Sequence, residues 1–484
     1  MRVPRFTLAV FLILSLATAA VAQETMAIVG GTLIDGTGRE PVRDSAVVIK
    51  GSRIAAIGPR ARVTIPPEAR VVQAGGKFIT PGLIDNSVHL ILMIVPEFYI
   101  KYEERLEDIA IQSAQVALKY GVTTVRDSWG PLEPLMRARQ RINSGRVPGS
   151  RVLVAGNIVG CGGPFSDYFL KERGASTSPL VKKRINAMWE ENVGPDLLGK
   201  RPDEVRQEIR KYLARGIDFL KVAVSAHGVQ GQPLMFSPEV LKGIGEEVHA
   251  AGKIFESHTA SPESLRLAIE AGVDLLQHPE SVGPRDVPDD LIALIKQKNI
   301  FCAILTTNER AVKTIQEQRL VNPWFAGMET SQSAQRIKNY RKMIAAGVRL
   351  AMATDNGPQA WDVGYRPMSP LIGRKHFETM EDYEAAGLSP MQVLIASTRA
   401  GAEACRMEKD LGTLEVGKIA DLLVLTADPL ESIANMRKID EVMKDGRFVD
   451  RRRLPENPIL KFDPELPFER WLKQTEERTI SNKR

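Results

Sequence analysis

The feature that most constrains the fold is a series of eight strand-like segments, most of them separated by amphipathic helical segments. In the helical segments, such as residues 109–120 and 330–346, apolar residues recur every three to four positions. Eight such units predict an α/β fold, a (β/α)8 TIM barrel. The strands are expected at residues 79–89, 122–127, 151–158, 217–224, 253–258, 273–278, 300–305 and 349–355. A doubly wound sheet is the alternative, but the chain lacks the spacing of a glycine-rich dinucleotide turn.

Short strand signals separated by turns occupy residues 24–79 and return at 411–453. They indicate all-β segments on either side of a barrel at residues 80–410. The connection at residues 159–215 is too long for an ordinary loop, and we expect it to act as a lid or to bind substrate. The tail at 454–484 combines prolines with mixed charge, so we expect it to wrap the surface or to be partly disordered.

Residues 1–22 have the features of a secretory signal peptide. Arg2 and Arg5 precede an apolar run at 6–20, which is short for a membrane span and ends in a small-residue cleavage site. We expect a secreted or periplasmic protein with no stable membrane insertion after cleavage; an uncleaved anchor is the alternative. Loss of the two arginines lowers the formal charge from +6 to +4, which is too weak and scattered to predict nucleic-acid binding.

Side chains that can bind metal, either directly or after chemical modification, recur on the predicted strands. Most lie at the C-terminal ends of the strands, where barrel enzymes place their catalytic groups. They are His89, Lys221, His258, His278 and Asp355. The chain has only six histidines, and three of them fall at these positions. Each residue alone could be structural, but imidazole and carboxylate are ligands that zinc accepts, so the set together predicts a metal site.

Several segments of the chain resemble the amidohydrolase superfamily, in its imidazolonepropionase-related, prolidase-like branch. They are residues 31–36, 80–85, 121–127 and 411–421. The first and last resemble the two halves of a composite β-sandwich that lies beside the barrel in that family. The resemblance therefore implies a metal-dependent hydrolase that binds one or two divalent ions, with zinc expected.

The same resemblance implies a role for each residue. Lys221 matches a lysine that reacts with carbon dioxide to form a carbamate, which can bridge two metals. His258 and His278 match the ligands of one ion, and His89 and Asp355 match ligands of the other. Asp355 also matches the general base.

One position departs from the family pattern. The first predicted strand should carry His-x-His, and Ser87 stands in place of the first histidine. A neutral hydroxyl is a much poorer zinc ligand than imidazole. We therefore expect the ion at His89 and Asp355 to bind more weakly than the ion at His258 and His278.

These observations predict an exported hydrolase in which a metal-bound hydroxide attacks a carbon–nitrogen bond in an amide, dipeptide or cyclic amide. His227 and Tyr168 are candidates for binding this small-molecule substrate. One alternative is a non-catalytic small-molecule binding protein on the same scaffold. A lactonase, isomerase or decarboxylase is another, and the sequence leaves homo-oligomerisation open.

Overall fold

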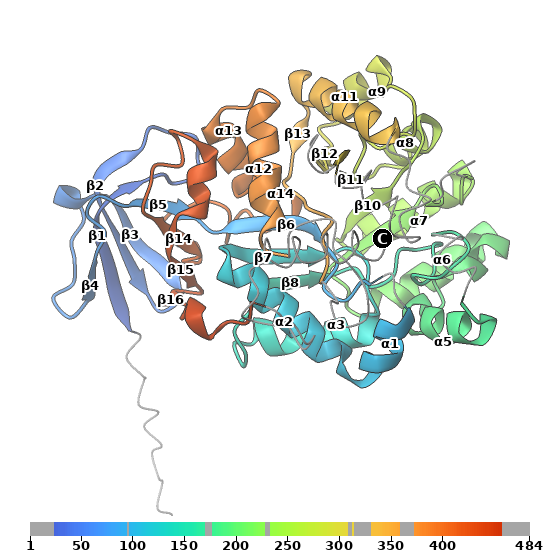
Figure 1. The fold of residues 1–484 in the computed structure, drawn as a ribbon, viewed down its shortest axis with the longest axis horizontal. Coiled ribbons are helices and arrows are strands. Elements are labelled where there is room, and N and C mark those ends of the chain that lie inside the picture. The colour runs from blue at the N-terminus through green and yellow to red at the C-terminus, as the bar shows by residue number, and fades with distance from the viewer. Residues whose placement is uncertain are drawn as a thin grey trace, which may run out of the picture.

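The computed structural model describes residues 24–93, 96–169, 177–227, 233–307, 312–313, 331–358 and 372–456. They form a barrel with a sheet domain beside it (Figure 1). The barrel strands are β6 (Leu83–Val88), β7 (Val122–Asp127), β8 (Arg151–Val154), β9 (Phe219–Ala223), β10 (Ile254–His258), β11 (Leu275–Gln277), β12 (Phe301–Ala303) and β13 (Arg349–Leu350). Each lies within a predicted strand segment, and the predicted TIM-barrel fold is confirmed.

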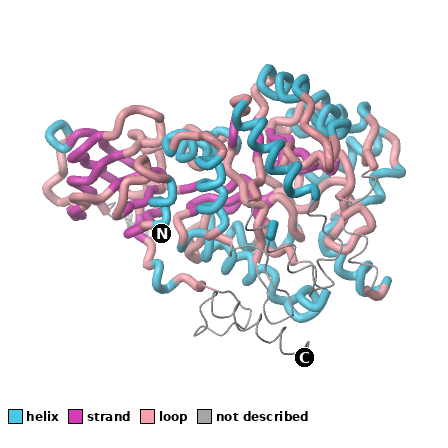
Figure 2. The backbone as a smooth tube through the Cα atoms, turned by 45° about the horizontal axis from the view of Figure 1, so that its top comes forward, coloured by secondary structure: helices cyan, strands magenta, loops and turns pink. Residues whose placement is uncertain are grey.

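Helices surround these strands (Figure 2). They are α1 (Pro96–Tyr102), α2 (Leu106–Lys119), α3 (Leu132–Asn143), α5 (Pro179–Glu190), α6 (Pro202–Leu213), α7 (Pro238–Ala250), α8 (Pro262–Glu270), α9 (Asp289–Gln297), α11 (Ser331–Ala345), α12 (Lys375–Ala385), α13 (Pro390–Ala396) and α14 (Arg399–Ala404). Among the described residues, no helix is both long and apolar enough to cross a membrane.

Two sets of parallel strands close into the barrel. Strands β9 to β13 form one set and β6 to β8 the other. A bridge between Val159 and Val222 joins the sets on one side. On the other side, Val88 pairs with Asn356, just beyond β13. This second seam places the end of β6 against the segment that carries Asp355.

The sheet domain is built from both ends of the described chain. Its strands are β1 (Thr25–Leu33), β2 (Val42–Lys50), β3 (Arg53–Pro59), β4 (Arg70–Gln73), β5 (Phe78–Pro81), β14 (Leu422–Leu425), β15 (Ile439–Lys444) and β16 (Arg447–Phe448). Strand β14 pairs antiparallel with β5, which joins the two ends. Successive side chains of β14 point to opposite faces: Leu422 packs in the core of the sheet domain and Leu423 in the barrel core.

The first predicted strand is in fact two strands. Residues 79–89 were expected to be continuous, but β5 belongs to the sheet domain and β6 to the barrel. Gly82 separates them, and a Cβ atom at this glycine would lie 2.4 Å from the Thr123 side chain. The chain thus passes from β5 to β6 at Gly82, where it lies close to Thr123.

The long connection after β8 is partly helical. It contains α5, a short 3-10 helix at Pro195–Gly199 and α6. Both α5 and α6 have proline in the first turn, where the missing N–H is not needed. The predicted signal peptide at 1–22 and most of the predicted tail, residues 457–484, lie outside the described residues.

A completely buried ion pair ties opposite parts of the barrel interior together. The guanidinium of Arg126, on β7, donates to Glu256 Oε2, on β10, at 2.8 Å, and neither side chain is exposed to solvent. Arg126 also lies over the Phe219 ring, 4.0 Å from its centroid. Since removal of one partner leaves a buried charge without compensation, the pair is sensitive to single substitutions.

We expect Arg126→Met to lower the free energy of unfolding by about 3–5 kcal/mol, because the Glu256 carboxylate loses its buried cation. Arg126→Met combined with Glu256→Gln should recover much of this loss. Urea unfolding of both variants measures the effect. Equal stability of Arg126→Met and the wild type would contradict this account of the pair.

Candidate functional site

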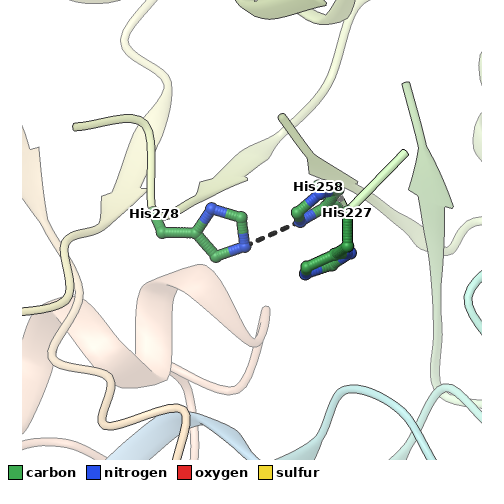
Figure 3. Close-up of side chains that lie close together, drawn as sticks. All are labelled: His227, His258 and His278. Atoms are coloured by element: carbon green, nitrogen blue, oxygen red, sulfur yellow. Dashed lines mark hydrogen bonds between the residues drawn. The ribbon is translucent and has the colours of Figure 1, made fainter. Parts of the chain in front are cut away.

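Three histidines converge at the C-terminal ends of adjacent barrel strands (Figure 3). His258 is the last residue of β10, His278 directly follows β11, and His227 follows β9. One ring nitrogen from each lies within 4.8 Å of the others. His258 Nδ1 is 2.9 Å from His278 Nε2, and the rings of His227 and His258 stack with centroids 3.4 Å apart. The structure thus brings together two predicted ligands and one predicted substrate-binding residue.

These imidazoles are suited to binding a metal. Burial lowers the pKa of His278 to about 3 and holds the pKa values of His227 and His258 well below their ordinary value. At neutral pH the three rings are therefore uncharged, and each has a lone pair to donate. Several of their buried ring nitrogens have no hydrogen-bond partner: His227 Nδ1, His258 Nε2 and His278 Nδ1. The nitrogens that face each other, His258 Nδ1 and His278 Nε2, belong to uncharged rings and are of the type that zinc accepts.

A second group of side chains lies at the seam between β6 and β13. His89 Nε2 is 3.0 Å from Asp355 Oδ1. Ser87 Oγ donates to the same oxygen at 3.1 Å. Burial opposes ionisation of Asp355, but the charges of His89 and Lys221 and the hydrogen bond from His89 hold its pKa well below the usual value. Asp355 is therefore a carboxylate at neutral pH.

Lys221 connects the two groups electrostatically. It lies on β9 with 2 % of its surface exposed. Its positive charge lowers the pKa values of all three convergent histidines and of Asp355. The five predicted metal-site residues, together with His227, thus occupy one region at the C-terminal end of the barrel.

Aromatic side chains form a wall next to this region. The ring of Trp129, just after β7, stacks on His227 at a centroid distance of 6.5 Å and meets Phe169 edge-on at 4.4 Å. Phe169 also contacts the His227 ring, at 4.7 Å. The candidate Tyr168 contributes its backbone instead, because its carbonyl accepts the N–H of His227 at 2.9 Å. Trp129 was not predicted, although its place just beyond a strand end could have indicated it.

Two residues of the site have unusual backbone conformations. His278 and Asp355 have φ angles of 39° and 53°, in the left-handed region that non-glycine residues seldom adopt. Such conformations persist only where the surroundings enforce them, and they concentrate at functional sites. Here they occur directly after β11, at His278, and in the segment beyond β13, at Asp355.

Two more carboxyl groups lie beneath the site. Burial raises the pKa of Asp85 to about 7, although hydrogen bonds from Thr354 and Ser87 oppose the rise. Burial likewise raises the pKa of Asp127 to about 6, against the opposing charge of His89. Neither residue was assigned a role from the sequence, because an aspartate within a strand gives no sign of what lies across the barrel.

The raised pKa of Asp85 predicts a pH dependence. A carboxyl whose pKa is higher in the folded than in the unfolded chain stabilises the fold below pH 4, and this contribution is lost as the pH rises towards 7. Between pH 5 and 8, metal-free wild type should therefore lose up to about 3 kcal/mol relative to Asp85→Asn. Denaturant unfolding at both pH values measures the difference. Parallel pH profiles for the two proteins would refute the prediction.

Comparison with known proteins identifies the family of the chain. The Amidohydrolase family model matches residues 78–449. A structure of molinate hydrolase aligns with a TM-score of 0.84 and 35% identity, covering 92% of this chain and 98% of that one. Phenylurea hydrolase B aligns with a TM-score of 0.84 and 32% identity, covering 91% and 100%. Ochratoxinase from Aspergillus niger is 27% identical over 87% of this chain and 85% of its own length. The chain therefore belongs to the amidohydrolase family, as its motifs predicted, and is an amidohydrolase.

Proposed function

We propose that this protein is an exported, metal-dependent hydrolase that cleaves a carbon–nitrogen bond in a small molecule. The observation that carries the proposal is the convergence of three uncharged histidines beside an ionised aspartate. The signal-like sequence at residues 1–22 supports export to the periplasm or the medium.

Zinc is the proposed ion, since the site offers imidazole and carboxylate ligands. His258 and His278 would hold one ion, and His227 is placed to assist them. His89 and Asp355 would hold a second, weaker one. Lys221, as a carbamate, would supply an anionic ligand between the two.

When bound, the metal supplies an activated water and polarises the scissile carbonyl. The protein's own residues manage the proton. Asp355 is ionised, so it can accept a proton from the attacking water and return it to the leaving nitrogen. His89 contacts the same carboxylate and can hold it in place during the transfer. Burial of the surrounding side chains strengthens these electrostatic interactions.

The aromatic wall of Trp129 and Phe169 beside His227 supports a substrate with a flat or apolar group next to the cleaved bond. The name of one relative, phenylurea hydrolase B, points the same way. We propose amides and ureas with an aromatic or apolar substituent as the first substrates to assay, followed by dipeptides, cyclic amides and lactones.

The replacement of histidine by Ser87 favours one other function, that of a non-catalytic binding protein. A lactonase or isomerase would use the same residues. The substrate panel separates these possibilities: binding without turnover favours the first, and product analysis identifies the second.

The catalytic roles can be tested with Asp355→Ala. Because loss of the base removes the proton acceptor, we expect turnover to fall by about 100- to 10,000-fold. Removal of metal by a chelator should abolish turnover, and zinc should restore it. The matched control is Asp218→Ala, which removes a partly buried carboxylate that pairs with Arg139. Undiminished hydrolysis by Asp355→Ala, or no zinc uptake by the wild type, would overturn the mechanism.

Restoring the missing histidine tests the asymmetry between the two metal sites. We expect Ser87→His to raise the zinc content or affinity of the protein, since imidazole binds zinc far better than a hydroxyl. Ser87→Ala is the control and should raise neither the zinc content nor the zinc affinity. Metal analysis after dialysis against graded free zinc gives the readout. An unchanged zinc content and affinity in Ser87→His would show that residue 87 does not limit metal binding.

A further inference from the structure

Asp85 is a buried carboxyl group with an unusual set of partners. Its Oδ1 accepts the N–H of Ser87 at 3.2 Å and the N–H of Thr354 at 3.0 Å. Its Oδ2 accepts the hydroxyl of Thr354 at 2.7 Å. One side chain thus holds two segments, β6 and the stretch after β13, across the seam of the barrel.

Both segments that Asp85 holds are in direct contact with Asp355. Thr354 is its neighbour in the chain. The carbonyl of Ser87 accepts the Asp355 N–H at 2.8 Å, and Ser87 Oγ donates to Asp355 Oδ1. Asp85 therefore acts on Asp355 through two independent connections.

Asp355 needs such support from the opposite strand. Strand β13 ends at Leu350, five residues before it, so the β12 ladder does not extend to this position. Its backbone is also held in the left-handed region. A carboxylate in this situation would sample several orientations unless other side chains fixed it.

We propose that Asp85, Thr354 and Ser87 form a positioning clamp for the Asp355 carboxylate. The inference rests on the proposed function, in which Asp355 is the base. It gives Ser87 a role that the family pattern does not suggest: the residue that replaces a metal-binding histidine orients the base by hydrogen bonding. Within the described part of the chain, Ser87 and His89 both bond to Oδ1 of this carboxylate, which leaves Oδ2 to take the proton.

Thr354→Val and Thr354→Ser test the clamp as a matched pair. Valine keeps the shape of threonine but loses the hydroxyl, whereas serine keeps the hydroxyl. With the panel substrate that the wild type hydrolyses fastest, Thr354→Val should lower kcat by about 10- to 100-fold, because small misplacements of a catalytic group have effects of this size. KM and the zinc bound at the three histidines should stay near wild type, and Thr354→Ser should restore most of kcat.

A second variant keeps the test valid if Thr354→Val fails to fold. Ser87→Ala removes only the hydroxyl that reaches Asp355, and it should also lower kcat without a matching change in KM. A crystal structure of the variant should show the Asp355 carboxylate displaced. Unchanged kcat in the folded variants would overturn the clamp.

The outcomes also separate this inference from the proposed function. If the wild type takes up zinc and hydrolyses a substrate while Thr354→Val and Ser87→Ala are as active, only the clamp is wrong. If the wild type neither takes up zinc from a Zn²⁺ titration nor turns over any substrate of the panel, the role of Asp355 as base falls, and the clamp falls with it.

Discussion

The hydrogen bonds that close the barrel between β6 and the segment after β13 are the constraint on which the rest of the site depends. The N–H of Asn86 reaches the carbonyl of Met352, and the N–H of His89 reaches that of Asn356. Between them, the Asp355 N–H reaches Ser87. Because these bonds fix the register of the two ends of the barrel, His89 and Asp355 meet although they are far apart in the sequence.

Burial then determines the chemistry of the side chains that the barrel brings together. The convergent histidines are too deeply buried to carry charge at neutral pH, while nearby positive charges keep Asp355 ionised. The same protein interior thus favours neutral metal ligands on one side and an anionic base on the other. In the unmodified, metal-free protein, burial is the main cause for the histidines, and the charges of His89 and Lys221 are the cause for Asp355.

Much of this site could be predicted from sequence, because a barrel places strand ends in one region and the polar residues there are few. The positions of His89, His258, His278 and Asp355 followed from this rule. Contacts across the barrel could not be predicted, since no local pattern links Asp85 to Thr354. Nor could the sequence distinguish Tyr168 from its neighbour Phe169, because only the loop conformation determines which side chain meets His227. The split at Gly82 depends likewise on a tertiary contact, with Thr123.

The central claim is that a metal ion binds where His227, His258 and His278 converge. Anomalous diffraction at the zinc edge, from crystals of the zinc-treated protein, tests it most directly. The account predicts a strong peak within bonding distance of His258 and His278, with a weaker peak or none beside His89 and Asp355. An absence of any peak at the three histidines, in crystals that contain zinc elsewhere, would contradict it.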